Sequence, residues 1–284
     1  EIQTSQVQPI EPVFVDYKKD MSQFEAQPGI DVLYKKNETN DIFTLIYVFN
    51  TGTENDPALN LAFNYLSYLG TDKMTAEEIA SEMYDIACSF YMNAGANQSS
   101  IQITGLSENM GKAMEIVEGL IAGAKPDEAI LENCKADMLK SRADAKLNQS
   151  RCFGALQRYL FYGGDFIRRT TLTDPALQAL TSEQLLAKIG GLMGKQHEVL
   201  YYGPQKETEI KSALAEHHKV AADLQPLEKK FSALLPTDAN KVVLAQYDAK
   251  QLYYLQFSNR GEKFDVAADP EITLYNEYFG GGMN

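Results

Sequence analysis

Hydrophobic residues follow strand-like and helix-like spacing in turn along the first part of the chain. Residues 32–50, VLYKKNETNDIFTLIYVFN, hold two β-rich runs around a polar loop, which predicts a β-hairpin. Apolar residues then recur at helical spacing over residues 57–69, and Gly70 supplies a common helix stop. Thr75 and Glu78 form a capping box that begins a second helix. A hairpin followed by two helices is therefore the first predicted unit.

The same alternation continues further along the chain. Strands are predicted at residues 90–94, 100–104 and 197–203, and helices at residues 108–122, 126–147, 151–162, 181–193 and 207–216. Groups of strands separated by groups of helices are typical of an α+β fold. We therefore predict a mainly antiparallel sheet that is covered by helices on one face.

The pattern also divides the chain into successive segments. Residues 1–30 read as an N-terminal extension or linker, and residues 31–218 as the α+β domain. Residues 219–240 resemble a linker, after which residues 241–284 restart with strand, strand, helix and glycine. Two strands and one helix bury little core alone. We therefore expect the last segment to be the start of a second, truncated domain of the same kind.

Composition narrows the class of protein without identifying it. The 284 residues are 44% hydrophobic and 23% charged, which is ordinary for a soluble globular protein. No apolar run approaches the roughly 18 residues of a membrane span. A net charge of −13 without a basic cluster argues against a nucleic-acid partner. The chain begins without Met or a signal-peptide pattern, so we expect a processed or excised piece, and the compartment stays open: cytoplasmic, periplasmic or secreted.

Residues that commonly carry chemistry are scarce. The chain has three cysteines without metal-type spacing: Cys88, Cys134 and Cys152. We expect buried thiols rather than disulfides or nucleophiles. It also has three histidines: His197, His217 and His218. We expect these at the surface or at helix ends, where they suit the helix dipole, rather than as metal ligands.

The order and local sequence of these elements resemble the pitrilysin/insulinase family of zinc metallopeptidases. The resemblance covers nearly the whole chain and rests on five stretches: YVFNTGTEND, LGTDKMTAEEIASEM, SFYMNAGANQS, LTSEQL and NEYFGGGMN. It implies a metallohydrolase-type α+β domain at the start of the family's C-terminal half, followed by the beginning of a second similar domain.

The resemblance also implies where a zinc site belongs. In active members the helix before a Gly-Thr break carries H-x-x-E-H, whose two His bind one zinc while the Glu activates the bound water. Counted back from that break, the matching positions here are Leu61, Asn64 and Tyr65. The window for the third ligand, residues 139–142, holds no carboxylate. The resemblance therefore implies that this chain has neither catalytic residues nor metal ligands.

The stretch SFYMNAG matches an edge strand that, in active domains, is thought to take up peptide by strand addition. Asn93 and Ala94 stand where the family pattern has Asn-Ala, and they are weak candidates for binding a peptide substrate. An ordinary strand kept for the fold is the simpler interpretation.

The resemblance favours a non-catalytic portion of a zinc peptidase, which helps to form a peptide-enclosing chamber. On this hypothesis the chain holds no cofactor, and the zinc lies on an active half or partner subunit of a zinc metalloendopeptidase. Its expected partners are that half and a peptide substrate, without nucleic acid or a membrane span. The alternative is a scaffolding subunit of a larger assembly without proteolysis.

Overall fold

The computed structural model describes residues 14–227, 232–248, 251–261, 263 and 265–279. These residues belong to two compact units. The first comprises the described parts of Glu1–Ser141 and Arg169–Phe231, and the second those of Arg142–Arg168 and Ser232–Asn284.

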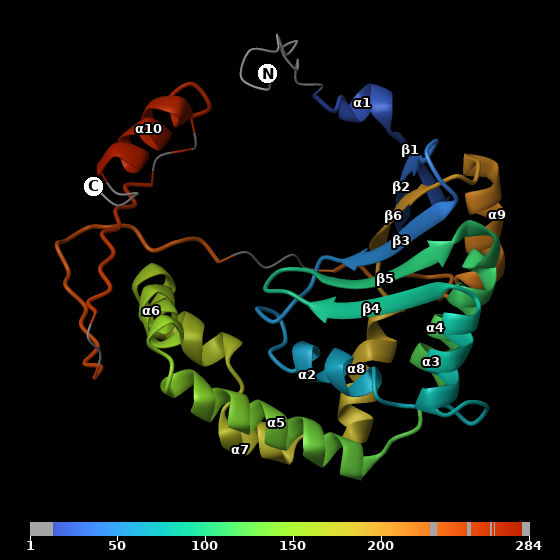
Figure 1. Ribbon diagram of the computed structural model, residues 1–284, viewed down its shortest axis with the longest axis horizontal. Coiled ribbons are helices and arrows are strands. Elements are labelled where there is room, and N and C mark those ends of the chain that lie inside the picture. The colour runs from blue at the N-terminus through green and yellow to red at the C-terminus, as the bar shows by residue number, and fades with distance from the viewer. Residues whose placement is uncertain (1–13, 228–231, 249–250, 262, 264, 280–284) are drawn as a thin grey trace, which may run out of the picture. The chain divides into compact units, whose positions relative to one another are not determined.

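A six-stranded sheet is the frame of the first unit (Figure 1). Its strands are β1 (Ser22–Gln27), β2 (Ile30–Lys36), β3 (Ile42–Phe49), β4 (Cys88–Ala94), β5 (Ser99–Leu106) and β6 (His197–Gly203). Across the sheet they run in the order β1-β2-β6-β3-β5-β4. Only β2 and β6 pair in parallel, and the other neighbours are antiparallel. The prediction of a mainly antiparallel sheet is confirmed.

Helices cover one face of this sheet. The helices of the first unit are α1 (Tyr17–Asp20), α2 (Leu59–Leu66), α3 (Ala76–Asp85), α4 (Met110–Gly123), α5 (Glu128–Lys146), whose end belongs to the second unit, α7 (Asp174–Ala179), α8 (Ser182–Leu192) and α9 (Glu207–His217). Of these, α2, α3 and α4 pack on β4 and β5, α8 packs on α2 and α4, and α1 has no buried residue. Along β3, alternate side chains from Phe43 to Phe49 are buried, whereas those between them are only partly buried. Since strand side chains alternate between faces, the hydrophobic core lies on one side, where α2, α3, α4 and α8 are drawn in Figure 1.

The hairpin predicted for residues 32–50 is wrong. Both strands form, but β6 lies between them, parallel to β2 and antiparallel to β3. The backbone N–H of Asn37, just after β2, donates to Gly203 O at the end of β6 (2.7 Å). A pairing between segments so far apart in sequence depends on tertiary packing, which the local pattern does not contain.

β2 instead forms a hairpin with β1. Its turn contains Gly29 at φ 89°, a conformation that glycine adopts without a steric cost. Residues 22–27, which were expected to lie in an N-terminal extension, are therefore an edge strand of the sheet. The segment expected to be a linker at 219–240 likewise begins within the first unit, since Gln225 N donates to Gly194 O (3.0 Å).

The second unit contains most of α6 (Gln149–Thr170) and α10 (Asp269–Phe279). The helix predicted at 151–162 stops where Gly163, at φ 79° and ψ 173°, interrupts α6. The two strands predicted for residues 241–259 do not appear among the described residues of that segment. The chain there instead contacts α6 through aromatic rings, with the centroids of Phe161 and Phe257 4.6 Å apart. Two lone strands have no partner sheet within this unit, which is the physical reason for the difference.

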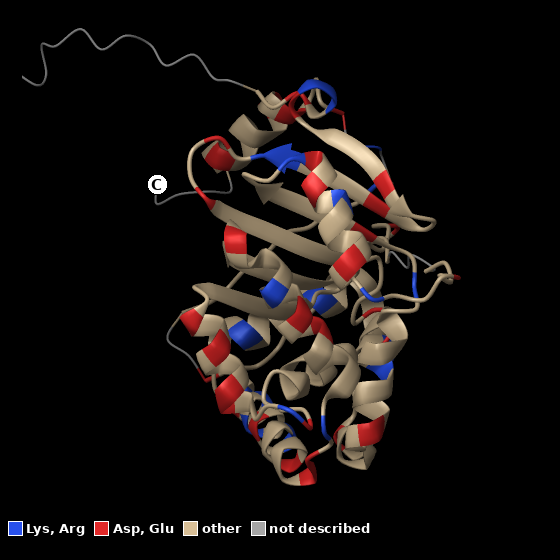
Figure 2. Ribbon diagram, turned by 90° about the vertical axis from the view of Figure 1, so that its right-hand side faces the viewer, with Lys and Arg blue, Asp and Glu red and all other residues tan. Residues whose placement is uncertain are grey.

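Acidic residues are dispersed rather than clustered on the face shown in Figure 2. On the face shown in Figure 2, acidic residues are spread over helices and strands, with basic residues between them rather than in one stripe. Among the helices that the structure describes, none is long and apolar enough to cross a membrane.

Candidate functional site

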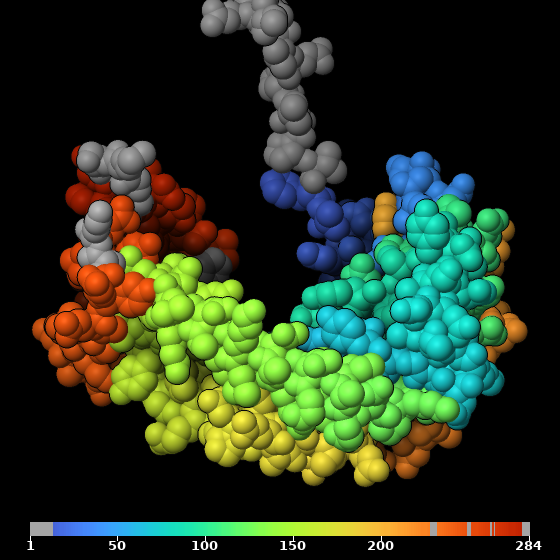
Figure 3. Space-filling view, turned by 60° about the horizontal axis from the view of Figure 1, so that its bottom comes forward, coloured from blue at the N-terminus to red at the C-terminus, as the bar shows by residue number. Residues whose placement is uncertain are grey.

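Helix α2 carries the three positions at which the family resemblance locates a zinc motif. Its inner face packs on the sheet and α8, so that Leu61 is 1% exposed and Tyr65 is 0% exposed. Asn64 is on the outer face and exposed. In the space-filling view the cyan atoms of α2 and α3 form one continuous part of the surface (Figure 3). The two positions that correspond to ligands therefore point into the core, and only the position that corresponds to the base reaches solvent.

Tyr65 joins three elements through its hydroxyl group. The backbone N–H of Asp127, just before α5, donates to this oxygen (2.7 Å). The oxygen also lies 2.8 Å from Ser182 Oγ, at the start of α8, and 3.1 Å from Asp127 O. A phenol donates one hydrogen bond and accepts two. Tyr65 therefore accepts from Asp127 N–H and donates its one hydrogen to Ser182 Oγ or to Asp127 O.

These residues do not fit a zinc ion. The Leu61 side chain has no lone pair, and the Tyr65 hydroxyl already has three hydrogen-bonding contacts. The amide of Asn64 has no basic lone pair to activate water. Residues 139–142, in α5, supply no carboxylate. In the part of the chain that the structure describes, no group of three or more His, Cys, Asp and Glu side chains is placed to hold a metal.

The structure places Asn93 and Ala94 at the end of β4, which is an edge strand of the sheet. Ala94 is buried and pairs with Ser99, while Asn93 is partly buried and pairs with Ser100. An edge strand has backbone groups free to pair with an added strand. The geometry permits peptide addition, and the substrate-binding role of these two residues stays a prediction.

Two of the three histidines are buried, contrary to the expectation of surface or cap positions for all of them. His197 begins β6 and is 4% exposed, and His218 follows α9 and is 6% exposed. Their Nε2 atoms lie 2.8 Å apart. His218 Nδ1 lies 2.6 Å from Glu118 Oε1 on α4, and the Tyr47 hydroxyl on β3 donates to the same oxygen (2.9 Å). A buried polar cluster of Tyr47, Glu118, His197 and His218 thus joins the sheet to α4 and α9.

The nitrogen atoms that carry hydrogen in this cluster can be assigned from the acceptor atoms beside them. His197 Nδ1 lies 2.7 Å from Lys195 O, and because a carbonyl oxygen only accepts, this nitrogen carries hydrogen. Burial lowers the pKa of His197 to about 4, so the ring is neutral at pH 7 and its Nε2 accepts from His218 Nε2–H. Burial and the Glu118 carboxylate raise the pKa of Tyr47 well above its usual value, so its hydroxyl remains a donor.

The lowered pKa of His197 predicts that the protein loses stability in mild acid. The unfolded chain binds a proton at this side chain below about pH 6.5, whereas the folded chain does so only below about pH 4. The free energy of unfolding should therefore decrease by up to about 3 kcal/mol from this group as the pH falls through that window. Urea unfolding of the wild type and of His197→Gln between pH 4 and 7.5 measures this decrease in the free energy of unfolding. Equal pH slopes for the two proteins would contradict the assignment.

The cysteines give no reactive site. Cys88 and Cys134 are buried free thiols, and Cys152 is partly exposed. Burial raises the pKa of both Cys88 and Cys134, which disfavours the nucleophilic thiolate.

Comparison with known proteins gives matches to solved structures alone. No family model and no curated protein sequence matches the chain. The periplasmic protease PqqL from Escherichia coli matches 77% of this chain and 24% of its own, at 14% identity and a TM-score of 0.61. A peptidase M16 inactive domain from Pseudomonas fluorescens matches 75% of this chain and 54% of its own, at 18% identity and a TM-score of 0.63. The ferredoxin protease FusC, solved in complex with Arabidopsis ferredoxin, matches 81% of this chain and 27% of its own, at 13% identity and a TM-score of 0.63.

This chain spans between about a quarter and about a half of the length of these solved structures. M16 is the peptidase group to which the pitrilysin and insulinase enzymes belong, so the matches agree with the resemblance read from the sequence. The chain therefore has the fold of M16 peptidase domains, a fold that is also found in an inactive domain of that group.

Proposed function

We propose that this chain is a non-catalytic portion of a zinc metallopeptidase of the pitrilysin/insulinase type. In this role it helps to form the peptide-enclosing chamber for an active, zinc-bearing half or partner subunit. One observation carries the proposal: on a peptidase fold, Leu61 and Tyr65 are buried packing residues, and these are the positions at which the family resemblance expects zinc ligands. The similarity to an M16 inactive domain supports the same interpretation.

Two further features support a role beside a peptide rather than in its cleavage. β4 is an edge strand, so it can pair with an extended segment. The structural neighbour FusC is described in complex with a protein, ferredoxin. By analogy, the peptide or protein that the parent enzyme encloses would contact this chain, while zinc on the other half performs the chemistry.

A hydrolysis assay tests the proposal. The purified chain should not cleave an unstructured fluorogenic peptide, with or without added zinc. The parent polypeptide or complex, isolated through a tag on this chain, should cleave the peptide and lose activity when a chelator removes zinc. Cleavage by the chain alone would overturn the proposal. An isolated parent or complex without chelator-sensitive cleavage would instead favour the scaffolding alternative.

A further inference from the structure

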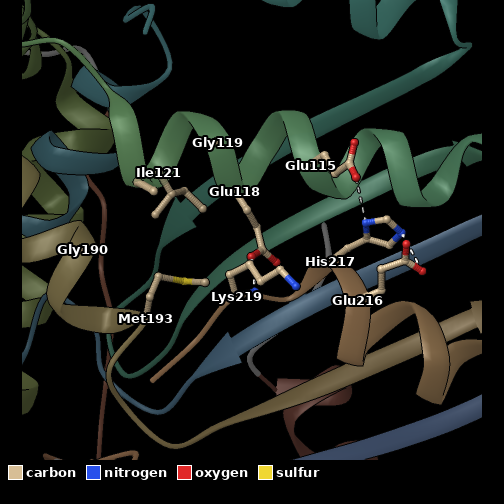
Figure 4. A pocket seen from close by; sticks show the side chains of 10 residues that line it. Glu115, Glu118, Gly119, Ile121, Gly190, Met193, Glu216, His217 and Lys219 are labelled. Carbon is tan, nitrogen blue, oxygen red and sulfur yellow. Dashed lines mark hydrogen bonds and ion pairs between the residues drawn. The ribbon is translucent and has the colours of Figure 1, made fainter. Parts of the chain in front are cut away.

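A cavity of about 390 Å³ opens among α4, the end of α8 and the end of α9 (Figure 4). Its α4 wall is formed by Glu115, Glu118, Gly119 and Ala122, which share one stripe of the helix because they are spaced by three, four and seven residues. The volume is within the range of small-ligand pockets, about 300–1,000 Å³. None of these residues belongs to α2 or β4, so the cavity is independent of the proposed peptidase role.

Two exposed helical glycines, Gly119 and Gly190, lie at one end of the cavity. A Cβ atom added at Gly119 of α4, or at Gly190 of α8, would meet nothing within 4 Å. A glycine inside a helix costs about 1 kcal/mol relative to alanine, and no neighbouring atom requires it at these two positions. Gly111, on the same helix, differs: its Cβ would lie 2.7 Å from His217 Nε2, so the packing there needs glycine. Together with Ile121 and Met193, the two open glycines give the cavity an apolar end.

The other end of the cavity is acidic. Glu118 is 7% exposed and has three contacts among the described residues. The Tyr47 hydroxyl donates to Oε1, His218 Nδ1 lies 2.6 Å from the same oxygen, and the backbone N–H of Lys219 donates to Oε2 (2.7 Å). A carboxylate has about four lone-pair positions, so Oε2 retains one for a further donor. Glu118 is one of the residues that line the cavity (Figure 4).

Two more carboxylates lie at this end, on either side of His217. The distance from His217 Nδ1 to Glu115 Oε1 is 3.1 Å, and that from His217 Nε2 to Glu216 Oε2 is 3.8 Å. Lys219 contributes one positive charge to the lining. Three glutamates, Glu115, Glu118 and Glu216, and one lysine line the cavity, so acidic side chains outnumber Lys219 there and favour a cationic ligand over an anionic one.

We propose that this cavity binds a positively charged alkyl group, an ammonium or guanidinium on an apolar stem. The stem lies along Gly119 and Gly190, and the cationic head donates to the free position of Glu118 Oε2 near Glu115 and Glu216. The apolar end of the cavity favours an apolar stem on the ligand, and the acidic end favours a positive charge. This chemistry occurs both in free alkylamines and in the lysine or arginine side chains of a polypeptide, and the probes below distinguish these sources.

Binding is tested on the purified chain by NMR, through the chemical shifts of selectively labelled methionine methyl groups, with Met193 as the reporter. The probes are n-hexylamine, 1-hexanol and Nα-acetyl-lysine methylamide. Hexylamine or the lysine derivative should bind saturably, at least about tenfold more tightly than hexanol, because a hydrogen bond to a charged group contributes about 1.5–3 kcal/mol. Preference for the lysine derivative identifies a polypeptide as the source, and preference for hexylamine identifies a free amine.

Substitutions locate the site. Gly119→Leu should abolish binding by filling the apolar end, and Gly190→Leu provides a second filled variant if the first does not fold. Gly154→Leu, at a helical glycine of α6 with equally open surroundings, should bind as the wild type does. The double change Glu115→Gln/Glu216→Gln should weaken amine binding about tenfold, since each exposed ion pair contributes up to about 1 kcal/mol. Absence of saturable binding to the folded wild type, or equal affinities for hexylamine and hexanol, would overturn the proposal.

Discussion

Replacing Tyr65 with alanine is expected to lower the free energy of unfolding by about 3–5 kcal/mol. The side chain is 0% exposed, so its removal leaves a cavity between α2 and its neighbours. It also removes the hydroxyl that bonds to Asp127 and Ser182, and leaves the buried Ser182 hydroxyl without that partner. Urea unfolding followed by circular dichroism measures the loss.

Two further variants separate the packing effect from the hydrogen-bonding effect. Tyr65→Phe keeps the ring and should cost about 1–3 kcal/mol, the penalty of unsatisfied buried groups. Tyr68 lies three positions later and is 57% exposed. Tyr68→Ala should therefore change the free energy of unfolding by no more than about 0.5 kcal/mol. If Tyr65→Ala were as mild as Tyr68→Ala, then position 65 would not be the structural contact described above.

Replacing Glu118 with alanine is expected to cost a similar amount, about 3–5 kcal/mol at pH 7. The change leaves the buried His218 ring and the Tyr47 hydroxyl without their shared acceptor. It also removes the carboxylate that accepts a hydrogen bond from the backbone N–H of Lys219, just after α9. The penalty is large because the groups left behind remain buried and cannot regain water.

Glu115→Ala is the matched control for this change. Glu115 lies one turn earlier on α4 and is exposed, so its loss should cost no more than about 0.5 kcal/mol. Equal stabilities for Glu118→Ala and Glu115→Ala would show that the buried cluster contributes little to holding α4 against the sheet.

Features that depend on nearby residues could be predicted from the sequence. The capping box of Thr75 and Glu78 is present, with Glu78 N donating to Thr75 Oγ1 and Thr75 N donating to Glu78 Oε2. The capping box of Thr181 and Gln184 is present as well. A cap joins residues three positions apart, so its signal lies entirely in the local sequence. Most helices and strands of the first unit were predicted from local patterns, but β1 and α7 were not.

Features that depend on distant residues could not be predicted in this way. The local patterns of β2 and β3 are compatible with a hairpin. In the structure β6, which is distant in sequence, lies between them and pairs with both. The bonds of Tyr65 to Asp127 and Ser182 likewise join residues that are distant in sequence.

One feature of the sequence, a charged residue on an apolar helix stripe, points to the buried cluster. Glu118 follows Val117 on the stripe of α4 that faces the core, where a charged residue is unexpected. A buried carboxylate needs partners, and the histidines, of which the chain has only three, were candidates for this role. Their places at a helix end and at the start of a strand led us to expect surface or cap positions, whereas His197 and His218 are buried near Glu118.

The zinc content of the purified chain tests the central claim most directly. The chain is dialysed against excess zinc, passed through a desalting column and analysed by mass spectrometry for metal, with an active zinc peptidase as the positive control. The account predicts far less than one zinc ion per chain, because Leu61 and Tyr65 are buried and Asn64 is a poor substitute for a base. One tightly retained zinc ion per chain would contradict it.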